Sequence, residues 1–361
     1  MLTNSHGPKP LHLHGFILPE AIEKDVYVVN GHVTFLPQEH AVTILKAGFI
    51  LPGLVDVHAH LALASPADAR ASTEEKVRAS ALAHLEAGVL AIREPGSPNY
   101  HSAKIGPHEG LPRVYSAGRF LAPKGYYFPG LAREAGDAEL PKAAEEEARK
   151  SGGWAKVIGD FTDLNGHMRP NYKVQTLIET AKRVHTLGAR IALHATTPEV
   201  IASAIEAGFD SIEHGWGVQD DHLAEMKIRG IAFVPTMTIL AEAPHFLPGM
   251  GLSHDDINEE LKFAKMHPDR VRRAFEAGVT ILAGTDAGIV KHGLVAEEIR
   301  LLIEAGLPSE AALAAGSWSA RRYLGLPCVE EGAPADLTAY TDDPRSDLKA
   351  LAQPALRMLG D

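Results

Sequence analysis

The sequence predicts an α/β protein organised as a (β/α)8 barrel, with small β segments at both chain ends. Short apolar runs alternate with helical stretches rich in Ala, Glu, Lys and Arg through most of the chain. The apolar runs lack a polar–apolar alternation, which is typical of parallel strands buried on both faces. Eight such runs joined by helices fit the usual barrel length of about 250 residues.

The eight predicted strands are Ile50–Val57, Val89–Arg93, Arg113–Ala117, Ala155–Ile158, Arg190–His194, Ser211–Glu213, Ala232–Pro235 and Thr280–Ala283. The alternative is an open, doubly wound sheet. We rank it second because no glycine-rich nucleotide-binding loop follows the first run.

Five helices are predicted between these runs, and a glycine that is typical of a helix C-cap follows each of them. They are Thr73–Ala87, Val174–Leu187, Pro198–Ala207, His222–Arg229 and Val271–Ala277, followed by Gly88, Gly188, Gly208, Gly230 and Gly278.

Both chain ends read as short strands. Asp25–Val29 and Val33–Leu36 flank Asn30-Gly31, a strong signal for a hairpin turn. Ala335–Tyr340 is a further strand candidate near the other end. The two ends are therefore expected to pair into one small sheet.

Composition narrows the class of protein. The 361 residues are 45% hydrophobic and 22% charged, with 35 basic and 46 acidic residues and a net charge of −11. An acidic chain repels phosphate backbones, so nucleic acid is not an expected partner. Cys328 is the single cysteine, which excludes an internal disulfide and a cysteine-based zinc site. Without a signal-peptide pattern or an apolar run of about 20 residues, we expect a cytoplasmic protein that acts on a small molecule, not on a membrane, and that is open to homo-oligomerisation.

Polar side chains follow four of the predicted strands. His58 and His60 end the first strand, His194 the fifth, His214 the sixth and Asp286 the eighth. Residues two apart in a strand point to the same side, so His58 and His60 are expected to project together. Barrel chemistry occurs where strands end, and four imidazoles with one carboxylate form a nitrogen and oxygen donor set. The sequence therefore predicts a metal site.

Lys156 lies in the fourth predicted strand between apolar neighbours. Burying a charged ammonium there is costly, and a cation would repel metals. A neutral amine reacts with carbon dioxide to form a carbamate, which is an anion able to bridge two metals. We interpret Lys156 in this way, in preference to a lysine that snorkels to solvent.

Taken as a set, these motifs resemble the amidohydrolase superfamily, in its imidazolonepropionase-like and prolidase-like metal-dependent branch. The resemblance covers nearly the whole chain. The segments that carry it are Leu51–His60, Val234–Thr236, Ala283–Gly288, His292-Gly293, Ser319–Leu326 and Gly332–Leu337.

The resemblance implies a barrel over residues 53–326 and a β-sandwich domain built from residues 1–52 and 327–361. It also implies two divalent metal ions. Zinc is expected, although manganese, cobalt or iron also suit such ligands. The implied roles are His58, His60 and Asp286 on the first metal, His194 and His214 on the second, and carboxylated Lys156 with a hydroxide between them.

The chemistry expected from this arrangement is hydrolysis of a small amide, cyclic amide, N-acyl amino acid or dipeptide. The bridging hydroxide attacks the carbonyl, and Asp286 acts first as general base and then as general acid. The same hydroxide attacks lactones and organophosphates, so the sequence does not name the substrate. Because His194 and His214 ligate only when neutral, activity is expected to fall in mild acid.

Prolidase-like relatives carry a Gly-Gly-His segment after the third strand, and Ala117–Gly130 contains no histidine. This departure weakens the case for dipeptidase activity. Tyr126 or Tyr127 is a candidate donor to the substrate carbonyl in its place, with loop packing as the alternative. Trp216 and His292 are further candidates for substrate contacts.

Two other functions are open. One is a mononuclear metal deaminase of an aminated heterocycle, using His58, His60, His194 and Asp286, with His214 as a catalytic group; it has no need of Lys156. The other is a barrel that serves only for binding, although such proteins typically lose metal ligands and every position here is filled. Arg93 and Glu94 are interpreted as a structural ion pair.

Overall fold

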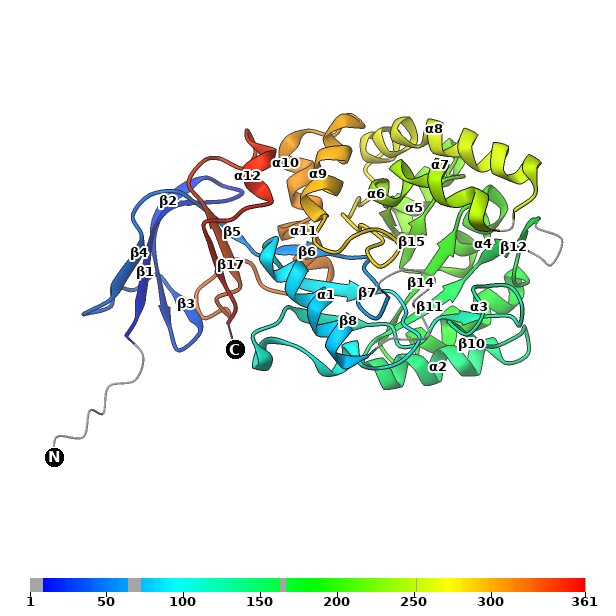
Figure 1. Cartoon of the computed structure of the whole chain (residues 1–361), viewed down its shortest axis with the longest axis horizontal. Coiled ribbons are helices and arrows are strands. Elements are labelled where there is room, and N and C mark those ends of the chain that lie inside the picture. Colours follow the sequence, from blue (N-terminus) through cyan, green and yellow to red (C-terminus); the bar gives the residue numbers. More distant parts are fainter. Residues whose placement is uncertain (1–8, 64–72, 163–166, 251, 361) are drawn as a thin grey trace.

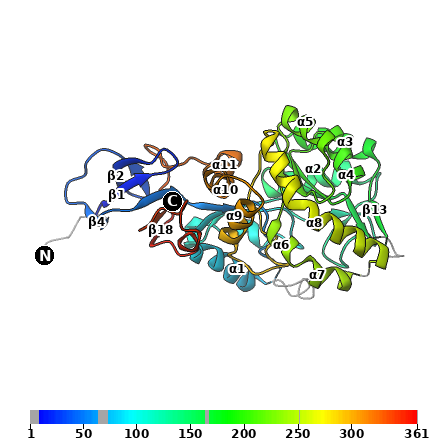
Figure 2. The same cartoon turned by 90° about the horizontal axis from the view of Figure 1, so that it is seen from above.

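The computed structural model describes residues 9–63, 73–162, 167–250 and 252–360. Figures 1 and 2 show a small sheet made from both chain ends at one end of the molecule, beside a larger part in which helices surround parallel strands. The fold is therefore α/β, as predicted.

The terminal sheet has seven strands in the order β18-β17-β5-β1-β2-β3, with β4 also pairing with β1. They are β1 (Leu11–Ile17), β2 (Ile22–Val29), β3 (His32–Thr34), β4 (Val42–Leu45), β5 (Phe49–Pro52), β17 (Leu337–Tyr340) and β18 (Leu356–Met358). The predicted hairpin is confirmed, since Val28 pairs with Val33 across Asn30-Gly31. Both turn residues have positive φ, 49° and 78°, which suits a tight two-residue turn.

The two chain ends meet where β17 pairs antiparallel with β5, with Leu337 opposite Pro52. The predicted pairing of the ends into one sheet is thus confirmed. The two facing sheets of a β-sandwich, which the resemblance implied, are not confirmed.

The parallel strands form a six-stranded sheet in the order β10-β9-β11-β14-β15-β16 and a three-stranded sheet in the order β6-β7-β8. They are β6 (Leu54–Asp56), β7 (Val89–Glu94), β8 (Arg113–Ser116), β9 (Leu121–Ala122), β10 (Arg133–Glu134), β11 (Trp154–Ile158), β14 (Arg190–Ala195), β15 (Ser211–His214) and β16 (Ala232–Val234). Every residue of β7, β11, β15 and β16 is buried, as the non-alternating apolar runs predicted. A short antiparallel hairpin, β12 (Asp160–Thr162) with β13 (Met168–Pro170), follows β11.

The first predicted strand, Ile50–Val57, is divided between two sheets. Its first part belongs to β5 of the terminal sheet, and its second part is β6. The division falls at Gly53, where a Cβ atom would lie 2.4 Å from the Leu90 side chain. Because glycine has no side chain, the backbone passes against Leu90 as it moves from one sheet to the other.

The eighth predicted strand, Thr280–Ala283, is not a regular strand. It makes one isolated bridge, between Ile281 and Phe233. Its backbone is nevertheless bonded on both sides, since Leu282 N–H donates to Phe233 O and Val57 N–H donates to Ala283 O, each at 3.0 Å. This segment therefore lies between β16 and the end of β6.

All five predicted helices are present, with some bounds changed. The helices are α1 (Glu74–Glu86), α2 (Leu140–Ser151), α3 (Val174–His185), α4 (Pro198–Ala207), α5 (Asp220–Arg229), α6 (Met237–Ala241), α7 (Ala243–Phe246), α8 (His254–Glu276), α9 (Val295–Glu304), α10 (Ser309–Ala315), α11 (Trp318–Tyr323) and α12 (Leu348–Leu351). The described residues also contain the 3₁₀ turns η2 (Ser102–Lys104), η3 (Pro107–Glu109) and η4 (Leu247–Met250). The predicted Val271–Ala277 is only the end of the 23-residue α8, which contains Pro268 in its interior.

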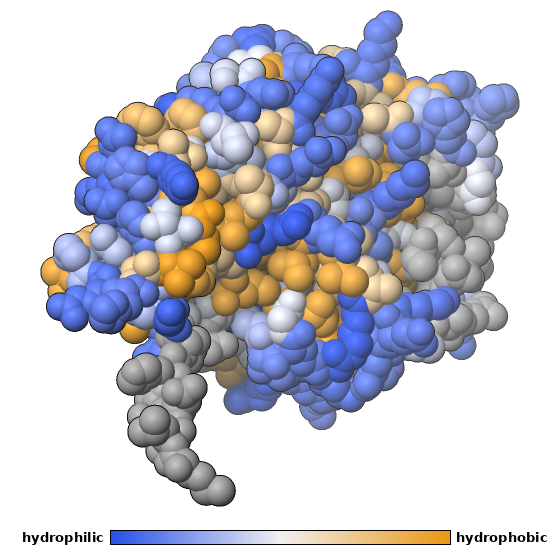
Figure 3. Space-filling view, turned by 60° about the vertical axis from the view of Figure 1, so that its left-hand side comes forward, coloured by the Kyte–Doolittle hydropathy of each residue, from blue (hydrophilic) through white to orange (hydrophobic). Residues whose placement is uncertain are grey.

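Hydrophobic side chains reach the surface mainly on the terminal sheet. Figure 3 turns this side forward and shows hydrophobic patches among the hydrophilic surface. Among the described residues, five of the eight large hydrophobic side chains that are exposed lie on or beside its strands: Phe16, Ile22, Leu36, Val42 and Ile44. Within the same described ranges, no helix combines the length and the apolar character needed to cross a membrane.

Candidate active site

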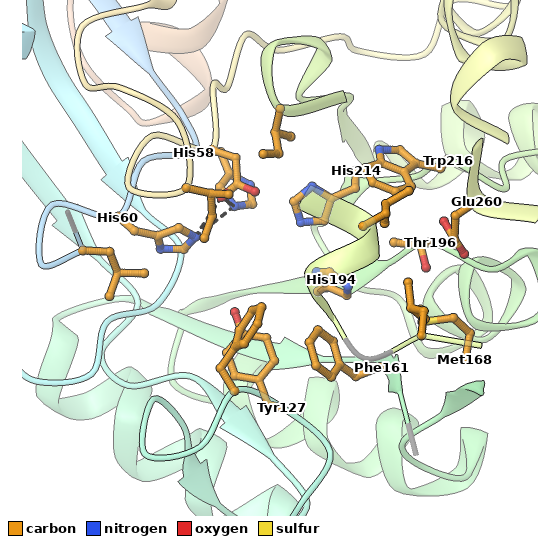
Figure 4. A pocket seen from close by; sticks show the side chains of 18 of the residues that line it. His58, His60, Tyr127, Phe161, Met168, His194, Thr196, His214, Trp216 and Glu260 are labelled. Carbon is orange, nitrogen blue, oxygen red and sulfur yellow. Dashed lines mark hydrogen bonds and ion pairs between the residues drawn. The ribbon is translucent and has the colours of Figure 1, made fainter. Parts of the chain in front are cut away.

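A cavity of about 220 Å³ opens where the parallel strands end. Figure 4 shows histidines from several of these strand ends pointing into it. All six residues that the sequence singled out for metal binding line this cavity: His58, His60, Lys156, His194, His214 and Asp286. The fold thus brings together residues that are up to 228 positions apart.

His58, His60 and Asp286 converge most closely. The Nε2 atoms of the two histidines lie 3.2 Å apart, so the two imidazoles project together as predicted. Asp286 Oδ1 lies 3.4 Å from His58 Nε2 and 3.2 Å from His60 Nε2. Atoms about 2.0–2.2 Å from a tetrahedral zinc lie about 3.3–3.6 Å from one another. The three atoms therefore have the spacing of ligands around one metal.

The hydrogen bonds behind the two imidazoles fix which nitrogen faces the others. His58 Nδ1 lies 2.6 Å from Glu213 Oε2, and His60 Nδ1 lies 2.8 Å from the Gly96 carbonyl. Both partners only accept, so each Nδ1 carries the proton and each neutral imidazole presents Nε2 as an acceptor. Two acceptors and a carboxylate oxygen then face one another, an arrangement that a cation stabilises. The residues present fit a metal ion.

His214 and His194 extend this group. One atom from each of His58, His214 and Asp286 lies within 4.8 Å of the others. The His214 and His194 rings are 4.6 Å apart between centroids. Thr236 Oγ1 lies 2.9 Å from His214 Nδ1 and holds that side of the ring, which leaves Nε2 free to face the cavity.

The backbone is strained at this site. His214, Thr236 and Asp286 have φ values of 68°, 47° and 58°, in the left-handed region that residues other than glycine seldom adopt. Each such residue costs of order 1–3 kcal/mol, and strain of this kind gathers at functional sites. The positive φ of His214 and Asp286 turns each chain sharply at the end of its strand segment, which aims both side chains inward.

A buried ionic network contacts His58 on the side of its Nδ1 atom. Arg93 Nη2 donates to both carboxylate oxygens of Glu213 at 2.7 Å, and Ser211 Oγ donates to Glu213 Oε1 at 2.5 Å. The interpretation of Arg93 and Glu94 as an ion pair is therefore wrong. Neighbouring strand residues point to opposite sides, and Glu94 instead accepts a hydrogen bond from Ser102. The missed signal was Glu213 itself, a carboxylate in a strand whose residues are all buried, which requires a partner.

Lys156 is 1% exposed. Burial lowers its pKa to about 8, although the negative charge of Glu213 acts in the opposite direction. A neutral amine is therefore accessible near physiological pH, as the interpretation of Lys156 requires.

Burial also favours the neutral forms of His194 and His214. It lowers the pKa of His194 to about 3 and that of His214 well below its usual value, and the charge of Lys156 lowers both further. His194 therefore stays unprotonated down to about pH 5, and its protonation does not account for the loss of activity in mild acid that the sequence led us to expect.

The four candidates for substrate contacts separate into two groups. Tyr127 and Trp216 line the cavity. Tyr126 and His292 are not among the described lining residues. His292 Nε2 lies 3.0 Å from the Leu63 carbonyl, and His292 Nδ1 lies 3.2 Å from His84 Nε2, so this ring is held beside the cavity.

The sequence did not single out several other lining residues. Apolar groups make up much of the cavity wall, and Tyr127 and Phe161 pack there with ring centroids 5.0 Å apart. Met168, Thr196 and Glu260 complete the side near Trp216 (Figure 4). Met168 begins β13, Thr196 follows β14 and Glu260 lies on α8.

A family model described as "Amidohydrolase family" matches residues 49–356. The chain belongs to the amidohydrolase family. Membership indicates a metal-dependent hydrolase that acts on C–N bonds, in agreement with the donor set of the cavity. An uncharacterized protein of Mycobacterium tuberculosis (strain H37Rv) is 36% identical to this amidohydrolase over 352 residues, which is 97% of this chain and 94% of that protein. Ochratoxinase of Aspergillus niger is 27% identical over 244 residues, which is 64% of this chain and 49% of the ochratoxinase.

Solved structures share the fold. A Xaa-Pro dipeptidase with bound methionine superposes with a TM-score of 0.84 at 22% identity, covering 97% of this amidohydrolase and 98% of that chain. A prolidase described as putative, from Bifidobacterium longum, gives 0.81 at 24% identity, with 97% and 93% covered. The A. niger ochratoxinase gives 0.81 at 20% identity, with 98% and 94% covered.

Proposed function

We propose that this amidohydrolase is a binuclear metal-dependent hydrolase of a small amide, cyclic amide or N-acyl amino acid. The observation that carries the proposal is the set of acceptor atoms of His58, His60 and Asp286, which face one another in the same cavity as a buried lysine. Relatives named as prolidases and as a Xaa-Pro dipeptidase support a C–N bond as the target.

In this proposal, His58, His60 and Asp286 hold one metal, and His194 and His214 hold the second. Lys156, carboxylated by carbon dioxide, holds both. When bound, two divalent ions, zinc in our proposal, would lower the pKa of a water molecule and polarise the substrate carbonyl.

Asp286 moves the proton. Burial would raise the pKa of Asp286, but the neighbouring histidines lower it well below its usual range, so Asp286 is a carboxylate when the substrate arrives. It accepts a proton from the attacking water and returns it to the leaving nitrogen, which allows the C–N bond to break without releasing an amide anion. The Arg93–Glu213 pair keeps the His58 ring in place during this cycle.

The wall of the cavity sets the size of the substrate. At about 220 Å³ the space is smaller than the ~300–1,000 Å³ of sites for drug-sized ligands. Tyr127 and Phe161 make much of this wall aromatic, which excludes water from the reacting bond. A compact amide with an apolar portion suits this space.

We further infer that the two parallel sheets belong to one (β/α)8 barrel spanning residues 53–326, with residues 1–52 and 327–361 forming the second domain. The hydrogen bonds of Thr280–Ala283 to Phe233 and to Val57 support closure between the last and first strands. The run from β8 into β9, which pairs with β11, supports closure on the other side.

The number of metal ions per chain tests whether a carbamate on Lys156 bridges two metals. We expect two metals per chain in the wild type grown with zinc and bicarbonate, and one or none in Lys156→Ala, because the substitution removes the shared anion. Elemental analysis gives the number directly. Lys182→Ala, which removes an exposed lysine on α3, is the matched control and should retain two. One metal in both the wild type and Lys156→Ala would remove the bridge and favour the mononuclear deaminase, to be sought by ammonia release from aminated heterocycles.

Reassembly of the site should depend on the pH at which zinc is supplied. Lys156 has a pKa of about 8, and only its neutral form reacts with carbon dioxide. About one-tenth of such an amine is neutral at pH 7 and about nine-tenths at pH 9. Uptake of the second zinc by metal-depleted protein, at constant dissolved carbon dioxide, should therefore rise about tenfold between pH 7 and 9 and then level off. A rise of about a hundredfold without a plateau would show a lysine with its ordinary pKa.

A further inference from the structure

Glu260 is a buried acid that the proposed reaction does not use. It lies on α8, is 3% exposed and lines the cavity. Figure 4 places it near Trp216 and Thr196, on the side of His194 and His214 and away from His60. A substrate held at the histidines therefore has one end directed toward this carboxylate.

Among the described residues, the buried Glu260 Oε2 atom has no hydrogen-bond partner. The charges that act on Glu260 come from the acids Asp160, Glu259 and Asp256. Burial, followed by these charges, raises the pKa of Glu260 to about 8. A buried ionised carboxylate without a partner is costly, so Glu260 holds a proton near pH 7 while the cavity is empty and ionises when a cation arrives.

The surroundings favour a cation. A second hollow, on the outer side of Glu260, is lined by Glu199, Asp256 and Glu259 as well as by Glu260 itself. Among the described residues that line the central cavity, Lys156 is the one lysine or arginine, and the proposed site uses it as a carbamate. The potential at this end of the cavity is therefore negative, which attracts a positively charged group and repels a carboxylate.

We propose that Glu260 binds a protonated amine of the substrate, so that the substrate class is small amides that carry a free amino group. This inference rests on the proposed amide hydrolysis and specifies its substrate. The ammonium donates to the Glu260 carboxylate while the amide carbonyl lies at the histidines. Apolar groups such as Phe161 and Met168 contact the carbon chain between them.

Paired substrates test this assignment. We would compare p-nitroanilides of glycine, 4-aminobutanoate and 6-aminohexanoate with the corresponding acetyl, butanoyl and hexanoyl anilides, which lack the amine. In the zinc-loaded wild type, kcat/KM for the best amine-bearing substrate should exceed that of its neutral partner about 10- to 100-fold, as expected for a charge-assisted hydrogen bond. Glu260→Gln should reduce the ratio to about one, mainly by raising KM, because it keeps the shape and removes the charge.

Glu259→Gln is the matched control, since Glu259 is the exposed neighbour of Glu260 on the same helix, and it should keep most of the preference. Hydrolysis of the neutral anilides without any preference for an amine would leave the amidase proposal standing and overturn the role of Glu260. The same conclusion would follow if Glu260→Gln kept the preference.

If no anilide is cleaved, a binding measurement tests whether Glu260 binds an ammonium group. Calorimetric titration of zinc-loaded protein with 2-phenylethylammonium and with the neutral 2-phenylethanol separates the charge from the apolar contact. Tighter binding of the ammonium to the wild type than to Glu260→Gln, with equal binding of the alcohol, supports the assignment. Equal binding of the ammonium to both proteins overturns it.

Discussion

Asp286→Asn is expected to reduce amide hydrolysis by about a thousandfold or more, because asparagine neither accepts the proton of the attacking water nor returns one to the leaving nitrogen. The substitution is close to isosteric, and Asp286 has a backbone φ of 58°, which asparagine tolerates better than most residues. The fold should therefore persist. The rate constant kcat, measured on an amide found by screening small amides and N-acyl amino acids, is the quantity to compare.

The same samples should be analysed for zinc, since Asp286 is also a proposed ligand. A thousandfold loss with zinc retained assigns the loss to proton transfer, whereas a parallel loss of both assigns it to ligation. Asp221→Asn changes an exposed aspartate at the start of α5 and should leave kcat unchanged. Activity of Asp286→Asn near that of the wild type would contradict both roles.

Of the substitutions proposed, one that breaks the Arg93–Glu213 pair should cause the largest decrease in the free energy of unfolding. Both side chains are fully buried, and Arg93 also donates to the Val57 carbonyl at 2.6 Å. Arg93→Met leaves the Glu213 carboxylate without its main counter-charge, and removal of one partner of a buried pair typically costs about 3–5 kcal/mol. Equilibrium unfolding in urea of the metal-depleted protein measures this change in the free energy of unfolding.

A double variant separates the cost of leaving the Glu213 carboxylate without a counter-charge from the cost of losing the Arg93 side chain. Arg93→Met/Glu213→Gln removes the uncompensated carboxylate and should recover most of the stability lost in Arg93→Met. Arg229→Met breaks an exposed pair with Glu225 and should cost less than about 1 kcal/mol. If Arg93→Met cost no more than Arg229→Met, the buried pair would not hold the strand ends together. Because Glu213 orients His58, zinc affinity should also fall in the variants that lose it.

Local sequence patterns determined the elements of this protein and the identity of its donor groups. Asn30-Gly31 specified a turn because few other pairs of residues adopt two successive positive φ values. Gly208 and Gly230 ended helices because glycine adopts a positive φ at a helix C-cap without strain. Apolar runs without alternation predicted the fully buried strands β7, β11 and β15. Histidines and an aspartate at strand ends were expected in one place, because parallel strands end on the same side of a sheet.

The tertiary structure alone decided which residues became neighbours across the chain. Arg93 pairs with Glu213, 120 positions away, because the two strands face each other; sequence proximity pointed to Glu94. Gly53 divides the first apolar run because Leu90 packs against it, and Glu260 enters the cavity because α8 lies over the strand ends. His292 is drawn beside the cavity by His84 and by the Leu63 carbonyl. Local patterns report backbone conformation and burial, whereas the partner of a buried charge depends on packing between distant segments.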